Sequence, residues 1–318
     1  MIMKNNFILS ICIPTYNRAK YLDKSIFSII NQKRFKDKND VEIVISDNCS
    51  TDNTKEVSLK YISIYPEKIR YFKNSNNIYA ANVEKALSYG KGTYLKVNND
   101  TLTHLDNSLD YLINLISNNI EKKDILFFPN GTIKNLKHIT CNDLNSFVKT
   151  VSFHSTWIGA FGIWKEDFDR LENFETIDES WLINDVLFNY ILYKKTVKLD
   201  NTKIFHSISP KYKGGYNLYK LFITNYLNIL EKYTNNYHIS KATLFNEKTK
   251  LLYKYLIPWT LILWKDSSKY KFSQDAAFSI AFKKYRFHPM FYPGLLYLIL
   301  RFLILDKIVI KYRNFKKI

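Results

Sequence analysis

Cysteine, glycine and proline are scarce in this chain of 318 residues, which contains 3 Cys, 8 Gly and 7 Pro. The cysteines are Cys12, Cys49 and Cys141, and their odd number and wide spacing argue against a disulfide framework. A reducing compartment, the cytoplasm, is therefore expected. The chain also lacks internal repeats and low-complexity linkers, and its 46% of hydrophobic residues excludes a disordered chain.

Acidic residues are outnumbered by basic ones, 29 against 47, which gives a formal net charge of +18. A field of this sign attracts polyanions such as nucleic acid, an anionic membrane surface or phosphorylated substrates. Nucleic acid is the least favoured of these, because the chain lacks zinc-finger spacing, a basic helix with heptads and the motifs of RNA-binding modules. Charge is the only feature that supports a nucleic-acid-binding function, so no nucleic-acid partner is expected.

Apolar runs long enough to cross a membrane are also missing. The C-terminal candidate, LLYLILRFLIL at Leu295–Leu305, is too short and contains Arg301. Such a length suits a buried helix or an interfacial segment, and the basic sequence KIVIKYRNFKKI follows it closely. We expect peripheral contact with an anionic membrane surface. The alternative is a solvated basic tail on a helix that packs against the rest of the chain.

The first apolar run, ILSICI at Ile8–Ile13, ends in a turn signal at Pro14 and not in a small-residue cleavage site. It predicts a strand rather than a signal peptide. Further strands are predicted at 41–46, 69–72 and 93–97, with helical spacing in the segments between them. This alternation predicts an α/β fold with a mostly parallel sheet and helices on both faces.

Polar clusters follow three of these predicted strands. PTYNR comes after the first strand, DNCSTDNT after the second and NND after the fourth. Ligands of parallel sheets bind at the carboxyl ends of the strands. All three clusters are therefore expected at one edge of the sheet, where they would form one site.

The pattern changes beyond residue 150. The run at 152–164 mixes small residues with aromatics, a helix is expected to open near Glu179, and a strand-like run ends at His206. The chain then becomes helical and aromatic, with a break expected at Pro258. We expect an α/β domain at 1–210, with halves at about 1–105 and 106–210, and a helical, aromatic and basic region at 211–318.

Three segments, ICIPTYNR, VEIVISDNCSTDNT and NIYAANVEKALSYGKGTYLKVNND, occur in this order and together resemble glycosyltransferase family 2. The resemblance covers about the first hundred residues. It implies a Rossmann-like GT-A fold, a nucleotide-sugar donor, a divalent cation (Mn²⁺ or Mg²⁺) as cofactor, and inversion at the anomeric carbon.

A nucleotide-sugar donor needs a clamp for its base and neutralisation of its diphosphate. Pro14 and Thr15 form a rigid turn whose backbone can hold a base edge, and Arg18 is either a phosphate contact or a solvated surface charge. The resemblance assigns Asp47 to the uracil imide N–H; the alternative is a helix N-cap, which Asp52 supplies equally well. The expected nucleotide-binding residues are Pro14, Thr15, Tyr16, Asn17, Arg18, Asp47, Asn48, Asn76, Asn98 and Asn99.

The metal site is expected at Asp100. Family members place Asp-x-Asp or a run of Asp here, whereas this chain has Asn98-Asn99-Asp100 and keeps only the last carboxylate. Divalent cations prefer oxygen ligands, and an Asn carbonyl supplies one without charge, so the diphosphate would provide most of the ligands. The alternative is an Asx-turn at the strand end. The resemblance adds His206 as a metal or phosphate ligand, against a purely structural histidine.

Transfer with inversion needs a base that takes the proton of the acceptor hydroxyl. The family places an acidic pair at the start of a helix downstream of the metal motif, and Asp185 matches its last residue. Asp178 and Glu179 are rivals, although acids at a helix start are also favoured by the helix dipole.

The acceptor side is expected to include Trp157 and Gly159, unless that run is simply an aromatic core segment. Lys211 and Lys213 could close over the diphosphate as a loop. We expect a hexose or N-acetylhexosamine to pass from a UDP donor to a glycan or polyprenyl-linked acceptor. The setting would be synthesis of bacterial capsule, lipopolysaccharide or another surface polysaccharide at the inner face of the cytoplasmic membrane. The alternative, kept open by Asn98 and Asn99, is an inactive GT-A module that binds a nucleotide sugar or glycan.

Overall fold

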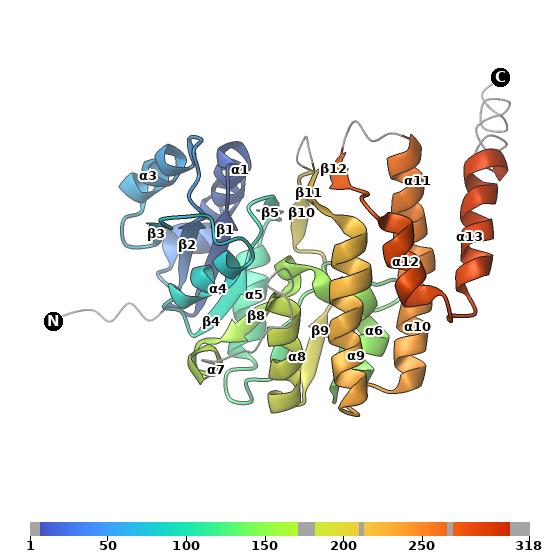
Figure 1. Cartoon of the computed structure of the whole chain (residues 1–318). Coiled ribbons are helices and arrows are strands. Elements are labelled where there is room, and N and C mark those ends of the chain that lie inside the picture. The colour runs from blue at the N-terminus through green and yellow to red at the C-terminus, as the bar shows by residue number, and fades with distance from the viewer. Residues whose placement is uncertain (1–6, 171–181, 210–212, 266–269, 306–318) are drawn as a thin grey trace, which may run out of the picture. The chain divides into compact units, whose positions relative to one another are not determined.

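The computed structural model of the chain describes residues 7–170, 182–209, 213–265 and 270–305. The chain divides into two compact units, Met1–Pro210 and Lys211–Ile318, and each is described by itself (Figure 1). The helix start expected near Glu179 lies outside the described residues, as do Asp178 and Lys211.

The first unit is built on a five-stranded sheet in the order β3-β2-β1-β4-β8. Its strands are β1 (Leu9–Thr15), β2 (Val41–Asp47), β3 (Ile69–Lys73), β4 (Tyr94–Val97) and β8 (Gly162–Trp164). The first four are parallel, and β8 runs antiparallel to β4 at the edge. Every residue of β2 is buried, so both faces of the sheet are covered. The mostly parallel α/β sheet that the sequence predicts is confirmed.

Four helices connect these strands: α1 (Ala19–Ile30), α2 (Lys33–Asp37), α3 (Thr54–Ile64) and α4 (Ala81–Ser88). α1 buries Leu22, Ile26, Ile29 and Ile30, whose spacing of three and four residues puts them on one helix face. This helix packs against α3, while α4 packs against β1, β2 and β4. The connections leave the PTYNR, DNCSTDNT and NND segments at the carboxyl ends of β1, β2 and β4.

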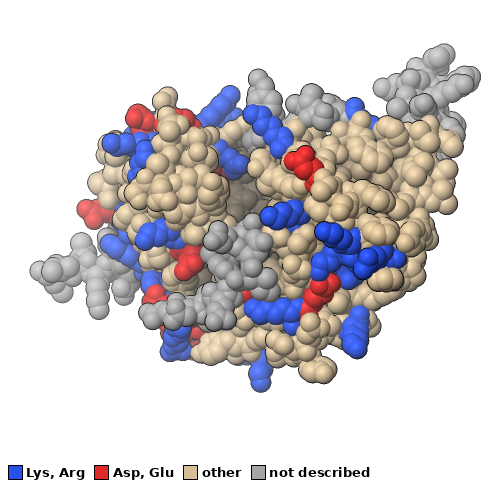
Figure 2. Space-filling view, in the orientation of Figure 1, with Lys and Arg blue, Asp and Glu red and all other residues tan. Residues whose placement is uncertain are grey.

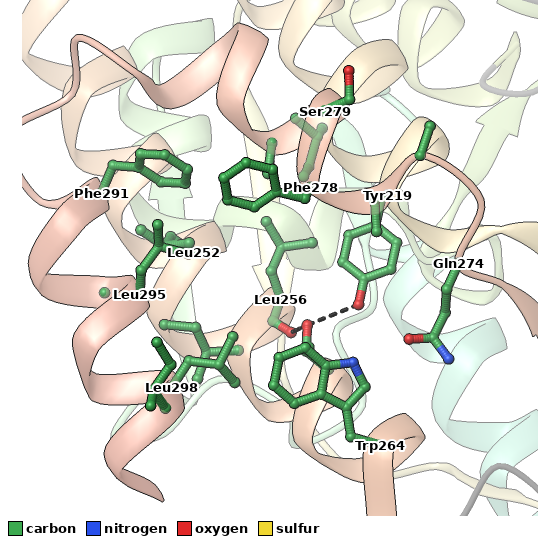
Figure 3. A pocket seen from close by; sticks show the side chains of 18 residues that line it. Tyr219, Leu252, Leu256, Trp264, Gln274, Phe278, Ser279, Phe291, Leu295 and Leu298 are labelled. Atoms are coloured by element: carbon green, nitrogen blue, oxygen red, sulfur yellow. Dashed lines mark hydrogen bonds between the residues drawn. The ribbon is translucent and has the colours of Figure 1, made fainter. Parts of the chain in front are cut away.

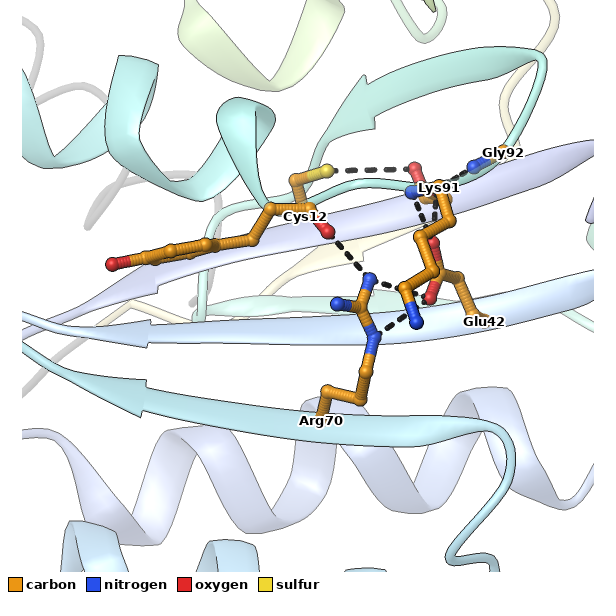
Figure 4. A network of polar contacts seen from close by, with 7 residues as sticks. Cys12, Glu42, Arg70, Lys91 and Gly92 are labelled. Carbon is orange, nitrogen blue, oxygen red and sulfur yellow. Dashed lines mark hydrogen bonds and ion pairs between the residues drawn. The ribbon is translucent and has the colours of Figure 1, made fainter.

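A buried polar network closes the opposite, amino-terminal edge of the sheet (Figure 4). Glu42 at the start of β2 is 1% exposed and accepts hydrogen bonds from Ser10 Oγ and from the Lys91 N–H, both at 2.6 Å. Its other oxygen forms an ion pair with Arg70 of β3 at 2.8 Å. Ser10 Oγ accepts from the Gly92 N–H at 2.7 Å. The network thus ties the starts of three strands to the turn before β4.

The rest of the first unit adds two smaller sheets. β5 (Leu102–His104) pairs antiparallel with β10 (Phe205–Ser207), and β9 (Val197–Asp200) lies between β6 (Ile125–Phe127) and β7 (His138–Cys141). The aromatic run at 152–164 forms two 3₁₀ turns, η1 (Ser152–Thr156) and η2 (Ile158–Ala160), before it enters β8. The remaining helices are α5 (Ser108–Ser117), α6 (Leu144–Val151), α7 (Lys165–Arg170) and α8 (Leu182–Lys194).

The second unit is helical, apart from a parallel pair of short strands, β11 (Lys213–Asn217) and β12 (Tyr270–Ser273). Its helices are α9 (Leu227–Asn235), α10 (Lys241–Leu251), α11 (Ile257–Lys265), α12 (Ala277–Tyr285) and α13 (Phe291–Leu300). Three π-helical segments join or extend them: η4 (Lys220–Tyr226), η5 (Leu252–Leu256) and η6 (Arg301–Leu305). In the described part of the chain, no helix has the length and apolar character needed to cross a bilayer.

The break expected at Pro258 is wrong. The chain stays helical from α10 through η5 into α11, and Pro258 is the second residue of α11. Proline lacks an N–H and its ring crowds the carbonyl four residues earlier, which lies in η5. The wider π-helical turn accommodates both effects, so the helix continues.

Candidate active site

The structure brings together the turn after β1 and the turn after β4. Thr15 Oγ1 donates a hydrogen bond to Asp100 Oδ2 at 2.9 Å, and Arg18 Nη1 donates to Asp100 Oδ1 at 3.0 Å. Asp100 is 2% exposed, whereas the side chain of Arg18 is 43% exposed. The carboxylate is therefore held inside the strand edge, with its cation on the solvent side.

The turn after β2 is hydrogen-bonded to the turn after β1. The Asn17 N–H donates to Ser50 Oγ at 2.9 Å, and Asn17 Oδ1 accepts from the Thr51 N–H at 2.8 Å. Asn17 has a φ of 51°, a left-handed conformation that asparagine tolerates better than most residues. Asp52 accepts from the Ala19 N–H at 2.9 Å, at the first residue of α1. The PTYNR and DNCSTDNT turns thus form one connected rim.

Burial governs the acidity of Asp100. Desolvation raises the pKa of its carboxyl, and the nearby Asp52 carboxylate adds to the rise, although Arg18 and Thr15 oppose it. An ionised carboxylate in such a place favours a compact cation that can replace part of its lost hydration. The buried carboxylate of Asp100 therefore suits contact with a cation, whether Arg18 or another one.

A divalent cation would find few other protein ligands here. Within the described residues, no group of three or more His, Cys, Asp or Glu could hold a metal ion. Asn99 is only half-buried and follows β4 directly. Mg²⁺ and similar ions are commonly bound by one or two carboxylates together with substrate phosphates and water. A single carboxylate at Asp100 fits a cation of this kind when a diphosphate is present.

Asn98 does not face the site. Its Nδ2 donates to Ser25 Oγ at 3.1 Å, and its Oδ1 lies 3.2 Å from His104 Nε2. Burial lowers the pKa of His104 to about 3, so the ring is neutral at physiological pH. Asn98 Oδ1 can only accept, so His104 Nε2 carries the proton and donates to it, while Nδ1, 3.0 Å from Ser108 Oγ, accepts from that hydroxyl. The amide of Asn98 is thus used in the interior, and its expected contact with a nucleotide stays a prediction.

Asp47 is fully buried at the end of β2. Its Oδ1 accepts from the Ser50 N–H at 2.8 Å, and its Oδ2 accepts from the Tyr71 hydroxyl at 2.6 Å. Burial and this carboxylate raise the pKa of Tyr71, which keeps the hydroxyl a donor. Asp47 is not the N-cap of α3, and Asp52 instead accepts from the Thr54 N–H at 3.1 Å. Because Asp47 is 0% exposed, a uracil imide could reach its carboxylate only if the surrounding groups moved.

Asn48 and Asn76 belong to the loops beside this rim. Asn48 is buried, donates to Asn77 Oδ1 at 2.6 Å and accepts from the Ile78 N–H at 2.8 Å, so it holds the loop that leads into α4. Asn76 is exposed on that loop. Tyr16 and Tyr79 present aromatic rings that are 44% and 77% exposed. The exposed Tyr79 was not expected from the sequence, although it lies within the segment NIYAAN.

The 3₁₀ turns after α6 border the strand that follows Asp100. A Cβ added at Gly159 would lie 2.9 Å from Leu102 Cδ1 and 2.9 Å from Trp157 Cε2, so only glycine leaves room here. Trp157 itself is half-buried. The Gly159 carbonyl accepts a hydrogen bond from Lys96 Nζ. The structure therefore places Trp157 and Gly159 next to β5, two residues beyond Asp100.

Lys96 is a buried cation that sequence reasoning missed. It is 1% exposed in β4, donates to the Val97 carbonyl at 2.8 Å, and lies over the rings of Phe128 and Phe205 at 5.4 and 5.3 Å. Burial lowers its pKa to about 7. The signal was available, since a lysine inside the apolar strand TYLKV interrupts a run that otherwise predicts a core strand.

Asp185 lies in α8 and is 1% exposed. Its neighbour Asn184 is fully buried, and Asn184 Nδ2 lies 3.4 Å from Ser155 Oγ of η1. Among the described residues, Asn184 Oδ1 has no hydrogen-bond partner, an unusual state for a buried amide. The α8 helix thus packs against the turn that precedes Trp157 and Gly159.

His206 reaches the same edge through β10. It pairs with Thr103 of β5, and the Ile208 N–H donates to the Thr101 carbonyl at 2.8 Å. Its side chain is exposed. Lys213 lies in β11 of the second unit, where only its backbone is described.

The first part of the chain matches known sequences. Residues 10–125 match the protein family described as Glycosyl transferase family 2. An abequosyltransferase, RfbV of Salmonella typhimurium, is 46% identical over 71 residues, which cover 22% of this chain and 21% of that protein. A GalNAc(5)-diNAcBac-PP-undecaprenol β-1,3-glucosyltransferase of Campylobacter jejuni is 43% identical over 68 residues, 21% of this chain and 20% of that protein. The chain thus aligns with about a fifth of the length of each relative.

Solved structures resemble the chain over most of its length. TarS 1-349 of S. aureus in complex with UDP-GlcNAc has a TM-score of 0.54 at 18% identity, over 92% of this chain and 80% of that one. A mannosyltransferase of Pyrobaculum calidifontis, PcManGT in complex with GDP-Man and Mn²⁺, has a TM-score of 0.51 at 13% identity, over 94% of this chain and 88% of that one. At these identities the likeness shows the GT-A fold alone. The chain thus has a GT-A fold, and over residues 10–125 it is similar to glycosyl transferase family 2.

Proposed function

We propose that the protein transfers a hexose or N-acetylhexosamine from a UDP donor, with inversion, to a glycan or polyprenyl-linked acceptor. The observation that carries the proposal is the buried carboxylate of Asp100, joined to the PTYNR turn through Thr15 and Arg18 at the carboxyl edge of the sheet. This is the edge where parallel α/β sheets bind ligands. The S. aureus and Pyrobaculum structures of similar fold contain UDP-GlcNAc and GDP-Man, which supports a nucleotide-sugar donor.

A cation, Mn²⁺ or Mg²⁺, would be held by Asp100 together with the donor's diphosphate, and it would stabilise the negative charge of the leaving diphosphate. Arg18 is well placed to act with it, since its half-exposed guanidinium can turn from Asp100 to a phosphate oxygen. His206, on the strand paired with β5, is a further candidate ligand. The rim formed by Asn17 and the DNCSTDNT turn would hold the nucleoside.

Asp185 is the proposed base. It would accept the proton of the acceptor hydroxyl while that oxygen attacks the anomeric carbon and the diphosphate leaves. The support is its position in α8, against the turn that leads to Trp157 and Gly159, whose aromatic face suits a sugar ring. Because Asp185 is buried, the acceptor has to open a path to it. Asp178 and Glu179 remain rival bases.

The proposed setting is bacterial surface-glycan synthesis at the inner face of the cytoplasmic membrane. The Salmonella relative is named as an abequosyltransferase, and the Campylobacter relative is named for a PP-undecaprenol-linked substrate. A minor teichoic acid biosynthesis protein of Bacillus subtilis, GgaB, is 25% identical over 125 residues. These names support a glycan or lipid-linked acceptor.

A second candidate function is a GT-A module that binds a nucleotide sugar or glycan without catalysis. The observation that favours it is the single carboxylate at the metal turn, where Asn98 is committed to the interior. Such a module would bind the donor and show no turnover on any acceptor.

Binding and turnover of UDP-sugars separate the two functions. UDP-GlcNAc and UDP-glucose are titrated by calorimetry with and without Mn²⁺, and hydrolysis and transfer are then assayed. The proteins are the native chain, Asp100→Ala, Asp185→Asn and the control Asp169→Asn, which changes an acid on α7 whose side chain is 53% exposed. Native turnover that is lost in the first two variants and kept in the control supports the enzyme. Metal-dependent binding without turnover supports the module, and turnover unchanged in Asp185→Asn removes Asp185 as the base.

A further inference from the structure

The second unit contains an apolar groove of about 550 Å³ (Figure 3). Leucine side chains from η5 and α13 and the ring of Phe278 from α12 line it. Tyr219 and Thr260 also line the groove, but their hydroxyl groups are hydrogen-bonded to each other at 2.8 Å. Gln274 and Ser279 are the other polar side chains of the lining. The volume is typical of a ligand site, and the lining suits hydrocarbon much better than sugar or nucleotide.

Unusual backbone shapes the walls of this groove. Ile223 belongs to the π-helical segment η4, and Leu252 and Leu256 belong to η5. π-helical turns are rare and are frequently found at functional sites. Gly294 of α13 also lines the groove, and a Cβ there would lie 3.0 Å from Leu252 Cδ2. The close approach of α13 to η5 therefore depends on glycine at this position.

One face of α13 and η6 continues the apolar surface of the groove outward. Leu296, Ile299 and Leu303 recur at helical spacing and are 59%, 49% and 52% exposed. Ile299 also lines the groove, so the two surfaces are continuous. An exposed apolar face of this extent, next to an apolar groove, is typical of a surface that contacts lipid or a partner.

Charge indicates what kind of molecule binds there. Residues 211–318 hold 20 Lys and Arg against 5 Asp and Glu, so they carry a net +15 of the chain's +18. Lys283 and Arg286, at the end of α12, are exposed. Lys and Arg side chains outnumber acidic ones over the face shown in Figure 2. The second part of the chain thus combines an apolar groove with a positive net charge, which is complementary to an amphiphile with a hydrocarbon tail and an anionic head.

We propose that this groove binds the polyprenyl tail of a lipid-linked acceptor, a proposal that rests on the function proposed above. The acceptor's diphosphate would supply the anionic head, and its tail would lie among the leucine, isoleucine and phenylalanine side chains. A prenyl tail is favoured over an acyl chain because the Campylobacter relative is named for a PP-undecaprenol-linked substrate. The exposed face of α13 would meet the part of the tail, or of the bilayer, that lies outside the groove.

The test is binding of undecaprenyl phosphate in nonionic detergent micelles to the full chain, followed by tryptophan fluorescence. Trp264 lines the groove and is 47% exposed, so the Trp264→Phe variant identifies its share of the signal. Ala277→Phe and Ala281→Phe each add a ring inside the groove at a half-buried position of α12. Ala242→Phe, on the exposed side of α10 and away from the groove, is the matched control. Circular dichroism and thermal unfolding establish that each variant is folded.

Saturable binding that weakens at least tenfold in Ala277→Phe and Ala281→Phe, and is unchanged in Ala242→Phe, is the expected result. Three outcomes would overturn the proposal: equal binding by all folded variants, equal competition by anionic phosphatidylglycerol vesicles without prenyl lipid, or a groove occupied by a second copy. Sedimentation would detect the last as a dimer that the two groove variants dissociate. Hydrolysis of UDP-GlcNAc by the native chain without lipid reports the proposed function separately. Hydrolysis without prenyl binding would overturn only the proposal for the groove. Prenyl binding without hydrolysis would overturn only the proposed enzymatic function.

Discussion

Asparagine at position 100 would keep the shape of the buried carboxylate and remove its charge. Asp100 is 2% exposed in the native protein, and burial raises the pKa of its carboxyl despite the nearby Arg18. Removing an ion from water costs roughly several kcal/mol. Asparagine keeps one acceptor oxygen, which can face Arg18, and its Nδ2 is a donor, so the Thr15 hydroxyl would have to turn and accept from it. The two contacts would weaken by about 2 kcal/mol together. We therefore expect Asp100→Asn to raise the free energy of unfolding by on the order of 1 kcal/mol.

Thermal unfolding and turnover measure the two effects of this substitution. A gain of that size raises the melting temperature by about 1–2 °C in a chain of 318 residues. Metal-dependent turnover should fall by at least about 100-fold, the usual loss when a group that stabilises transition-state charge is removed. Asp169→Asn, at an exposed acid, should change neither quantity. A variant that is more stable and less active would show that the carboxylate of Asp100 lowers the stability of the fold but is needed for the reaction.

The pH dependence of stability is a second check on the same residue. The pKa of Asp100 lies above its ordinary value of 3.8, so around that pH the folded state binds more protons than the unfolded state. Stability contributed by this group is therefore present at low pH and falls as the pH rises. The advantage of Asp100→Asn should be small below pH 3.8 and should grow as the pH rises above that value. A variant less stable than the native protein at neutral pH would refute the reasoning, since Arg18 and Thr15 would then outweigh desolvation.

Three further substitutions test other parts of the structure. The pKa of Lys96 is lowered from 10.5 to about 7. Between these two pH values the unfolded state binds more protons than the folded state, so stability should rise with pH. Urea unfolding of Lys96→Met should lack this rise. Glu42→Ala leaves Arg70 without its buried partner and should lower the free energy of unfolding by about 3–5 kcal/mol, measured by denaturant titration; a loss below about 1 kcal/mol would mean that water replaces the carboxylate. Gly159→Ala places a Cβ 2.9 Å from Leu102 Cδ1, and transfer to acceptor should decline while calorimetric affinity for UDP-sugar is kept; weakened donor binding would contradict an acceptor role.

Much of the fold could be predicted from local sequence. The apolar runs at 41–46 and 69–72 correspond to β2 and β3, because turn residues mark the ends of each run. Strand β8 could not be predicted, since its three residues have no period of their own. Its pairing depends on tertiary packing: Trp164 lies edge-on to Tyr94 at 5.0 Å, and Gly162 leaves room for the Tyr94 ring.

The convergence of the three polar turns was predictable for a related reason. Parallel strands bring their carboxyl ends together whatever the intervening sequence, so Thr15 and Asp100 meet although 85 residues separate them. The part played by each side chain in that edge was not predictable. Asp47 satisfies its carboxylate with Tyr71, a residue of the neighbouring strand, and sequence alone does not show which strand lies next to β2.

Asn98 and Asp100 are two residues apart, yet they act on opposite sides of the backbone. Asn98 Oδ1 accepts a hydrogen bond from the neutral ring of His104, whose pKa is lowered to about 3, and its Nδ2 donates to Ser25. An aspartate at this position would be a second buried charge with no cation beside it, so interior packing accounts for the asparagine. The proposed metal site then keeps one carboxylate, already paired with Arg18. A cation bound there would have to displace that guanidinium, and the diphosphate would offer both the missing ligands of the cation and a new partner for Arg18. We therefore expect the cation to bind together with the nucleotide sugar, and only weakly before it.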